Sequence, residues 1–532
     1  SRGTFIFPPA PSMRLTTDMI EWTLQSAPKW NPINVCSYHL QEAGAGPVLE
    51  IAFTLANAVA VLDAVKEGGR VSPEDFAALV GRISFFCNAG IRIVEEMCKI
   101  RAFARLWDRI TQDRYGVEDP KFRRFRYGVQ VNSLGLTAHQ PENNVYRILL
   151  EMLAVTMSKD SRARAVQLPA WNEALGLPRP WDQQWSLRAQ QIAALETDLL
   201  EYEDIFAGSK VIDAKTEQLE SDALKEMQVV LDKGGSLQSI DYMKERLVSA
   251  HAERQRAIES GDQTVVGVNA YTESEPSLLE SSSQEAAYQA TDPESENEAL
   301  QNLESWRKGR DAREAERSIS DLKKAAEGTE NLMEATLRAA TAGVTTGEWA
   351  GALREVFGEY RAPTGISGAS APSQVSTRDI DRVRADLKAL AKELSVKRLR
   401  LLVGKPGLDG HSNAAEQVAV RARDVGFEVI YQGIRLTPAE IAKAAAEEDV
   451  DAIGISILSG GHNFLVKEVL DRLAEQGIDP KKVPVIVGGV IPDEDAARLE
   501  KQGIARVFTP RDYNLTEAVG EIVELIRKAK SA

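Results

Sequence analysis

Three loops near the C-terminal end of this 532-residue chain hold the side chains best suited to chemistry. In the first loop, at 404–413, Asp409 stands two residues before His411. One imidazole nitrogen of His411 could bind a metal ion while Asp409 holds the N–H of the other nitrogen, which would fix the tautomer. Lys405 could extend this polar network. A lone Asp-x-His is more often a solvated loop pair, so the two other loops decide between these interpretations.

Serine and glycine mark the other two loops. Ser456 and Leu458 open the second loop, and Gly488 followed by Gly489 opens the third. A pair of glycines lets the backbone approach a bulky group closely. No Gly-x-Gly-x-x-Gly sequence opens the first helix of this part of the chain, which disfavours a nucleotide cofactor of the common kind.

The segments that position these loops alternate between strand-like and helical patterns. Apolar runs predict five strands, at 399–403, 428–431, 452–457, 483–487 and 506–508. Amphipathic helices are predicted to begin near Ala414, Pro438, Phe464, Asp493 and Leu515. Such βα repeats form a parallel sheet, and five strands in about 135 residues fit the flavodoxin-like order 2-1-3-4-5. Ligands of such sheets bind beyond the carboxyl ends of the strands, where all three loops would lie.

The rest of the chain falls into two parts of different composition. Residues 1–255 combine long amphipathic helical patterns, such as 48–66 and 75–107, with short apolar pieces, which predicts βα units. The apolar pieces lie at 33–38, 129–131 and 165–168. Residues 256–397 contain a Glu/Ser/Ala-rich linker and a Pro/Gly/Ser-rich boundary before the last part. Helical patterns in between lie at 297–326, 329–341, 346–357 and 378–395.

Bulk properties narrow the class of protein. The net charge of −15 disfavours a nucleic-acid partner. The three cysteines have neither a disulfide framework nor the spacing of metal ligands. The sequence shows no signal peptide and no run that we expect to span a membrane. A cytoplasmic enzyme or binding protein is therefore expected.

The order Asp409-x-His411, Ser456-x-Leu458 and Gly488-Gly489 on five βα units resembles the cobalamin domain of the mutase and methionine synthase families. The resemblance implies that His411 ligates the cobalt of adenosylcobalamin and that the serine and glycines line a slot for the nucleotide tail. The cofactor-binding residues that it implies here are Lys405, Asp409, His411, Ser456, Leu458, Gly488 and Gly489. The family has glycine where this chain has Ala414, which implies a tighter fit for the tail.

The first part of the chain resembles the substrate barrel of the adenosylcobalamin-dependent acyl-CoA mutases. The matching segments are 7–14, 37–44, 82–86 and 171–175. The resemblance implies an α/β protein with a partial (β/α)8 TIM-type barrel at 1–255, a linker with helices at 256–397, and a flavodoxin-like (Rossmann-like) cobalamin-binding domain at 398–532. A whole barrel needs about 250 residues. Because the resemblance starts midway through the barrel, we expect its earlier strands on another chain or outside this sequence.

Roles in the first part follow from the same resemblance. Arg2 would clamp the free carboxylate of the substrate through its guanidinium fork. His39 would hydrogen-bond the thioester carbonyl, and Tyr38 would lie beside the corrin and the substrate. Glu42 and Glu173 would face the adenosyl group, and the remaining substrate and CoA contacts would be Gln130, Arg82 and Ser84. Arg14 and Arg126 are expected to form structural ion pairs.

The segments 167–174 and 404–413 resemble the ethylmalonyl-CoA branch of the family. This implies a radical carbon-skeleton isomerase that interconverts ethylmalonyl-CoA and methylsuccinyl-CoA. Methylmalonyl-CoA and succinyl-CoA remain an alternative, because one methylene changes binding by only about 1–3 kcal/mol. A cobalamin-binding protein without catalysis and a corrinoid methyl carrier also remain open. Family members are homodimers or heterodimers, so a second chain is expected.

Overall fold

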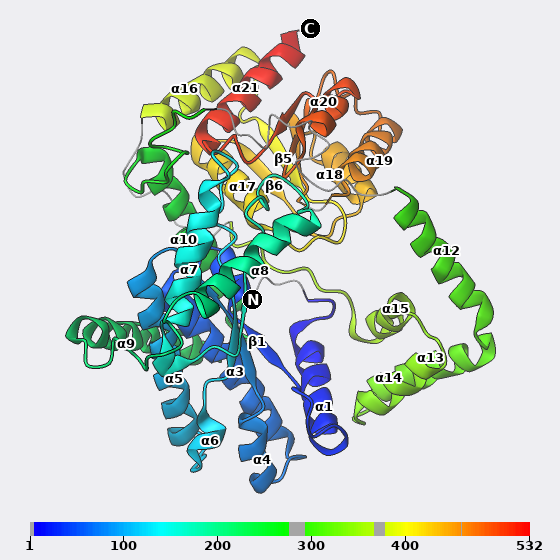
Figure 1. Ribbon diagram of the computed structural model, residues 1–532. Coiled ribbons are helices and arrows are strands. Elements are labelled where there is room, and N and C mark those ends of the chain that lie inside the picture. Colours follow the sequence, from blue (N-terminus) through cyan, green and yellow to red (C-terminus); the bar gives the residue numbers. More distant parts are fainter. Residues whose placement is uncertain (1–4, 276–292, 367–377, 459, 532) are drawn as a thin grey trace.

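The computed structural model describes residues 5–275, 293–366, 378–458 and 460–531. Figure 1 shows two α/β regions, one above the other, with a group of helices (α12 to α15) to one side. The lower region contains the N-terminal half of the chain, and the upper region contains its C-terminal part.

The lower region is built on a parallel sheet with strands in chain order. Its strands are β1 (Asn34–Cys36), β2 (Ser84–Ala89), β3 (Tyr127–Val131) and β4 (Ala165–Gln167), and each pairs only with its neighbours in sequence. Its helices are α1 (Pro9–Ser26), α2 (Tyr38–Glu42), α3 (Pro47–Gly68), α4 (Pro73–Val80), α5 (Ile93–Asp113), α6 (Pro120–Arg123), α7 (Asn143–Thr156), α8 (Pro180–Leu195), α9 (Lys210–Asp232) and α10 (Ile240–Ser260). Consecutive parallel neighbours joined by helices are what a run of strands in a (β/α)8 barrel looks like.

The sequence predicts one helical pattern over 75–107, and this prediction is wrong. The chain instead forms α4, then β2, then α5, with Gly81 and Gly90 in the two connections. Strand β2 lies between β1 and β3 and buries side chains on both of its faces. A strand of this kind shows no polar–apolar alternation, so periodicity does not distinguish it from part of a buried helix.

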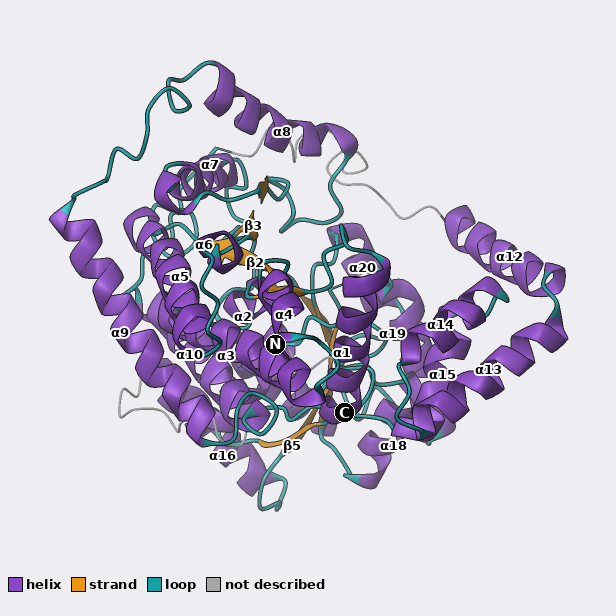
Figure 2. Cartoon of the chain, turned by 90° about the horizontal axis from the view of Figure 1, so that it is seen from below, coloured by secondary structure: helices purple, strands orange, loops and turns teal. Residues whose placement is uncertain are grey.

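Helix α3 is the core helix of the lower region. By length and composition it could cross a membrane, contrary to the expectation from sequence, but 72% of its most apolar window is buried inside the molecule. Leu55 and Leu62 are almost fully covered, and the helix packs against α5 and α9. Its hydropathy is accounted for by its place in the core (Figure 2).

A buried cluster of charges joins α3, α5 and β2. Lys99 of α5 is fully buried, and its Nζ lies 2.7 Å from Glu50 Oε2 and 2.8 Å from the carbonyl oxygen of Asn88. Glu96 also pairs with Lys99. Burial disfavours the ammonium, but Glu50 and Glu96 outweigh it and raise the pKa of Lys99. Glu50 in turn accepts a 2.6 Å hydrogen bond from Ser37, the residue before α2.

The upper region has the predicted topology. Its strands are β5 (Arg400–Gly404), β6 (Glu428–Tyr431), β7 (Ala452–Ser456), β8 (Val485–Gly488) and β9 (Arg506–Phe508), all parallel and in the order β6-β5-β7-β8-β9. This is the order 2-1-3-4-5 expected from sequence. Its helices are α16 (Arg378–Glu393), α17 (Asn413–Val425), α18 (Pro438–Glu447), α19 (His462–Glu475), α20 (Asp493–Lys501) and α21 (Leu515–Ser531).

Four helices follow the lower region in the chain, and one of them, α14, packs against α1. They are α12 (Pro293–Gly309), α13 (Ala312–Glu327), α14 (Leu332–Thr341) and α15 (Thr346–Phe357). The predicted pattern at 297–326 is broken by Asp311, which caps α13 by accepting from backbone amides. Phe7 joins the small apolar core of these helices, and Arg14 donates to the carbonyl oxygens of Ala325 and Ala326.

We predict that Lys99→Met lowers the free energy of unfolding by about 3–5 kcal/mol, because it leaves Glu50 and Glu96 buried without their cation. Urea unfolding followed by circular dichroism measures the change. The control is Lys225→Met, which removes an exposed pair with Asp222 and should cost no more than about 1 kcal/mol. Equal effects of the two variants would contradict the prediction.

Candidate functional site

The carboxyl ends of the two sheets meet at one cavity of about 1210 Å³. From the lower region the cavity is lined by Glu42, which ends α2, by Ser133 after β3, and by Glu173 after β4. From the upper region it is lined by the carboxyl ends of β7 and β8 and by the loops after β5, β7 and β8, which together contribute His411, Ser456, Leu458, Gly488 and Gly489. Seven of the residues expected at the site from sequence therefore surround one space.

A slot continues from this cavity into the upper region. One wall is the sheet, which contributes Leu401, Val403, Gly454 and Ile486. The opposite wall is formed by helices α17 and α21 and contributes Ala415, Val418, Val519 and Ile522. These lining side chains are apolar, so the slot suits a largely apolar group that enters from the carboxyl edge of the sheet.

Glycines in the strands test whether this slot fits a bulky cofactor. Gly454 in β7 and Gly488 at the end of β8 both line the cavity, and glycine is unfavourable within strands. A Cβ atom added at Gly454 would come no closer than 3.7 Å to another protein atom, and one at Gly488 no closer than 4.0 Å. The protein's own packing does not require glycine at either position. Space beside the backbone there is kept for another group, as cobalamin would need.

Gly489 is a glycine for a different reason. A Cβ at this position would lie 1.7 Å from the carbonyl oxygen of Ile457, so no side chain fits. This close approach brings the loop after β8 against the end of β7. The third loop is thereby fixed beside the second.

His411 is held at the mouth of the slot by a chain of two partners. Its Nδ1 lies 2.6 Å from Asp409 Oδ1, and the other oxygen of Asp409 accepts a 2.7 Å hydrogen bond from the buried Lys405. Burial raises the pKa of Asp409, but the hydrogen bonds from His411 and Lys405 outweigh it and bring that pKa well below its usual range. The His411 side chain is 51% exposed. Since Nδ1 is bound to the carboxylate, Nε2 is the nitrogen that can coordinate a metal.

Ala414, where the resembling family has glycine, causes no backbone strain. It is the second residue of α17 and does not have a positive φ. An alanine is compatible with this helical position. The departure from the family pattern therefore changes only the lining of the cavity, by one methyl group.

A hydrogen-bonded group on the lower side of the cavity includes three of the expected substrate and cofactor residues. Tyr38 Oη donates to Glu42 Oε1 at 2.5 Å and accepts from Gln130 Nε2 at 2.9 Å. Ser133 Oγ lies 3.1 Å from the same tyrosine oxygen. The half-buried ring of His39 packs edge-on against Tyr38, with 5.5 Å between centroids. Glu42 and Ser133 line the cavity. Tyr38 is connected to it through its hydrogen bonds with these two residues, and Gln130 through its hydrogen bond to Tyr38.

Glu173 faces this group from the loop after β4. Burial raises its pKa, while a hydrogen bond from Ser133 and the nearby His411 act in the opposite direction. The carboxyl of Glu173 thus lies between the lower and upper walls of the cavity, within electrostatic range of the imidazole that would bind cobalt.

Arg82 and Ser84 lie away from this cavity, at the amino end of β2. Ser84 is the first residue of the strand and donates a 2.8 Å hydrogen bond to Asn34. About 13 Å of strand separate it from Asn88 and its partner Gln130. Arg2 lies outside the described residues.

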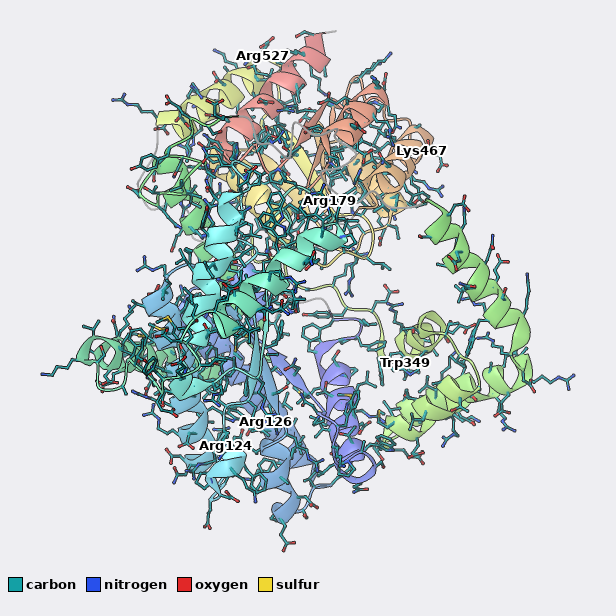
Figure 3. The ribbon with its side chains drawn as sticks, in the orientation of Figure 1. Arg124, Arg126, Arg179, Trp349, Lys467 and Arg527 are labelled. Atoms are coloured by element: carbon teal, nitrogen blue, oxygen red, sulfur yellow. The ribbon has the colours of Figure 1, made fainter. Side chains whose placement is uncertain are left out.

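Arg126 also lies at the amino end of the sheet, and the expected ion pair is wrong. Among the described residues no carboxylate pairs with it, and it donates instead to the carbonyl of Gly81. Burial and the neighbouring Arg164 lower its pKa. Figure 3 shows Arg124 and Arg126 low in the lower region, far from Arg179 near the upper one.

Several residues of the site were not expected from sequence. Ser133 is one, and its only sequence signal is that it follows a strand. His462 and Asp495 form another pair in the cavity wall, with 2.7 Å between Nε2 and Oδ2. Behind the loop after β3 lies Glu151 of α7, which is 1% exposed. Burial raises the pKa of Glu151 to about 9, because desolvation and Glu96 outweigh the nearby arginines.

The two parts of the chain that line the cavity match two known protein families. A sequence model described as "Methylmalonyl-CoA mutase" matches residues 1–359, and one described as "B12 binding domain" matches 399–519. The chain belongs to the methylmalonyl-CoA mutase family. The B12-binding match contains the first loop, with His411, and both other loops of the upper region. The mutase match contains the entire lower wall of the cavity.

Relatives within the mutase family differ in their similarity to this chain. Ethylmalonyl-CoA mutase from Cereibacter sphaeroides is 56% identical over 532 residues, which are 100% of this chain and 80% of the relative. Ethylmalonyl-CoA mutase from Methylorubrum extorquens is 54% identical over 531 residues, 99% of this chain and 76% of the relative. Methylmalonyl-CoA mutase from Escherichia coli is 33% identical over 535 residues, 99% of this chain and 72% of the relative.

We predict that alanine substitutions at Gly488 and Gly489 have different effects, the first on cofactor affinity and the second on stability. Gly488→Ala should leave the unfolding midpoint nearly unchanged and weaken cobalamin binding, because its methyl group points into space that the protein does not use. Gly489→Ala should cost at least about 1–3 kcal/mol of stability, since the added Cβ overlaps the Ile457 carbonyl. Thermal melts and cobalamin titrations measure both. Unchanged cobalamin affinity in Gly488→Ala would refute the assignment of the slot.

We predict that Glu151→Gln makes stability less dependent on pH. The folded protein keeps the Glu151 proton up to about pH 9, whereas the unfolded chain releases it near about pH 4.3. Between these values the folded state binds more protons, so this residue makes stability fall as the pH rises. The advantage of Glu151→Gln over wild type should therefore grow with pH, by up to about 4 kcal/mol between about pH 5 and pH 8. Urea unfolding at several pH values tests this, with exposed Glu118→Gln as the control.

Proposed function

We propose that this chain is a radical carbon-skeleton isomerase that interconverts ethylmalonyl-CoA and methylsuccinyl-CoA with adenosylcobalamin. The observation that carries the proposal is the placement of His411. It is held by Asp409 and Lys405 at one wall of a large cavity, and the opposite wall belongs to the mutase part of the chain. The identity of 56% and 54% to ethylmalonyl-CoA mutases, against 33% to a methylmalonyl-CoA mutase, supports this choice of substrate.

The upper wall would hold the cofactor. His411 would ligate cobalt through Nε2, and Asp409 with Lys405 would fix its tautomer and orientation. Ser456, Leu458, Gly488 and Gly489 would line the entrance to the slot, which would take the nucleotide tail. When bound, adenosylcobalamin supplies a cobalt–carbon bond whose homolytic cleavage starts radical chemistry. The protein therefore needs no nucleophile of its own.

The lower wall would hold the thioester. His39 would donate a hydrogen bond to the thioester carbonyl, and Tyr38 with Gln130 would shape the space beside it. Arg2 would bind the free carboxylate of the substrate through its guanidinium. Glu42 and Glu173 would face the adenosyl group. These residues bind, orient and exclude water, which protects a radical reaction from quenching.

The CoA tail would extend along the sheet from the cavity towards the amino ends of the strands. Arg82 and Ser84 lie at that end, on β2 and the turn before it. An extended pantetheine arm could span the strand, so both residues could contact one substrate molecule even though only one end of it lies in the cavity.

Three broader expectations also belong to this proposal. We place the enzyme in the cytoplasm. We divide the chain into a substrate barrel at 1–255, a linker with helices at 256–397 and a cobalamin domain at 398–532. We also expect a homodimer or heterodimer, which analytical ultracentrifugation of the purified chain would reveal.

We predict that adding adenosylcobalamin to the purified chain gives the absorption spectrum of histidine-ligated, base-off cobalamin, and that His411→Ala abolishes it. The control is Lys467→Ala, on the outer side of α19, which should bind as wild type does (Figure 3). Added ethylmalonyl-CoA should then be converted to methylsuccinyl-CoA faster than methylmalonyl-CoA is converted to succinyl-CoA, by mass spectrometry.

Each part of this experiment can fail separately. Binding without turnover of either thioester would favour a cobalamin-binding protein without catalysis. Faster turnover of methylmalonyl-CoA would transfer the proposal to that substrate. Absence of histidine ligation in the wild-type protein would overturn the proposed function as a whole.

A further inference from the structure

Helix α10 joins the two regions of the molecule. Leu247 belongs to the apolar core of the lower region, whereas Val248 and Ala252 belong to the core that contains α16, α17 and α21. The helix also touches the end of α2. A Cβ added at Gly44, which lies in the turn after α2 and has φ +111°, would lie 2.5 Å from His251 Cβ, so this turn and α10 meet without space for a side chain. One helix is thus in direct contact with both walls of the cavity.

Lys244 of α10 reaches across to the first turn of α17. Its Nζ lies 2.6 Å from Glu416 Oε1 and donates to Ser412 Oγ at 3.3 Å. The side chains are nearly inaccessible, at 5% for Lys244 and 3% for Glu416. Ser412 immediately follows His411 in the chain and is itself buried. The ammonium of Lys244 therefore acts on the residue next to the expected cobalt ligand.

A second contact ties the same turn to α2. Asn413 donates a hydrogen bond to the carbonyl oxygen of Glu42, the last residue of α2. The residues that follow His411 are thus anchored from two sides, by Lys244 of α10 and by the helix that carries Tyr38 and His39. Both anchors come from the lower region.

The burial of the Lys244–Glu416 pair makes its geometry strict. Taking an ammonium and a carboxylate out of water costs several kcal/mol per ion and is offset only when the two lie close and remaining donors are satisfied. The ammonium of Lys244 meets this requirement, because it pairs with the carboxylate of Glu416 and donates a hydrogen bond to the hydroxyl of Ser412. A pair of well-packed apolar side chains would fill the same space and be as stable or more so. Stability alone thus does not account for the pair.

We propose that Lys244 and Glu416 are positioning residues, which set the place of His411 relative to the substrate side of the cavity. The pair holds the first turn of α17 against α10, and α10 holds the end of α2. A cobalt ion bound to His411 would thereby be kept at a fixed distance from Tyr38, His39 and Glu42. This inference rests on the proposed function, because it concerns the expected cobalt ligand.

The test compares the wild-type chain with Lys244→Met/Glu416→Leu, which removes both charges together and leaves neither buried alone. The matched control is Lys467→Met/Asp471→Leu, an exposed pair in the same region. Hydrogen exchange of the amides at 407–413 is measured without cobalamin. The dissociation constant of adenosylcobalamin is measured by titration, and histidine ligation by the nitrogen splitting in the electron paramagnetic resonance spectrum of bound cob(II)alamin.

We expect the Lys244/Glu416 double variant to melt near the wild-type temperature but to exchange the amides at 407–413 faster. Its dissociation constant for cobalamin should rise about tenfold, as when an outer partner of a metal ligand is lost, and the fraction with nitrogen splitting should fall. The control pair should change none of these. If the double variant does not fold, Ser412→Ala removes only the hydroxyl that Lys244 contacts and should shift the same three readouts in the same direction.

Two outcomes would overturn the inference in distinguishable ways. Unchanged exchange, affinity and nitrogen splitting in the folded double variant, or in Ser412→Ala if the double variant does not fold, would remove the positioning role and leave the proposed function intact. Wild-type protein that binds no cobalamin, or binds it without nitrogen splitting, would overturn the proposed function and the inference with it.

Discussion

Parallel strands present all their carboxyl ends at one edge of a sheet, and here two such edges must face each other across one cavity. Neither region alone supplies all the residues that line the cavity. The upper sheet supplies His411 and the glycines of the slot, while Glu42, Ser133 and Glu173 come from the lower one. Everything that the site does therefore depends on how the two regions are held relative to one another, which is the task of α10 and of the contacts made by the first turn of α17.

Three buried lysines each fix one segment of the site. Lys99, Lys244 and Lys405 are at most 5% exposed, and each is paired with a carboxylate. Each also acts on a functional segment: Lys99 through Glu50 on the start of α2, Lys405 through Asp409 on His411, and Lys244 on the turn after it. An ammonium has three donors and can join several segments at one point. Because an unpaired charge is so costly inside a protein, such a junction admits little variation in geometry.

The sequence predicts the upper region well because its signals are local. Each strand is an apolar run followed by a short loop and an amphipathic helix, so the topology and the edge that carries His411 follow from general rules. Strand β2 escaped prediction because burial on both faces removes the alternation that marks a strand. Lys244 gave no signal at all: its partner Ser412 lies 168 residues away, and nothing in the periodicity of either helix reveals the contact. Ser133 and Glu151 were likewise found only through tertiary packing.

The long separation between α10 and its partners also bears on how the chain is made. During synthesis α10 emerges well before α17, because Ser412 lies 168 positions after Lys244. At the usual pace of translation this amounts to roughly ten to thirty seconds. Throughout that interval Val248 and Ala252 lack the apolar partners that the upper region later supplies. The apolar face of α10 is therefore exposed to solvent while the rest of the chain is being synthesised. A chaperone that shields newly made chains would therefore be expected to bind at this helix during that interval.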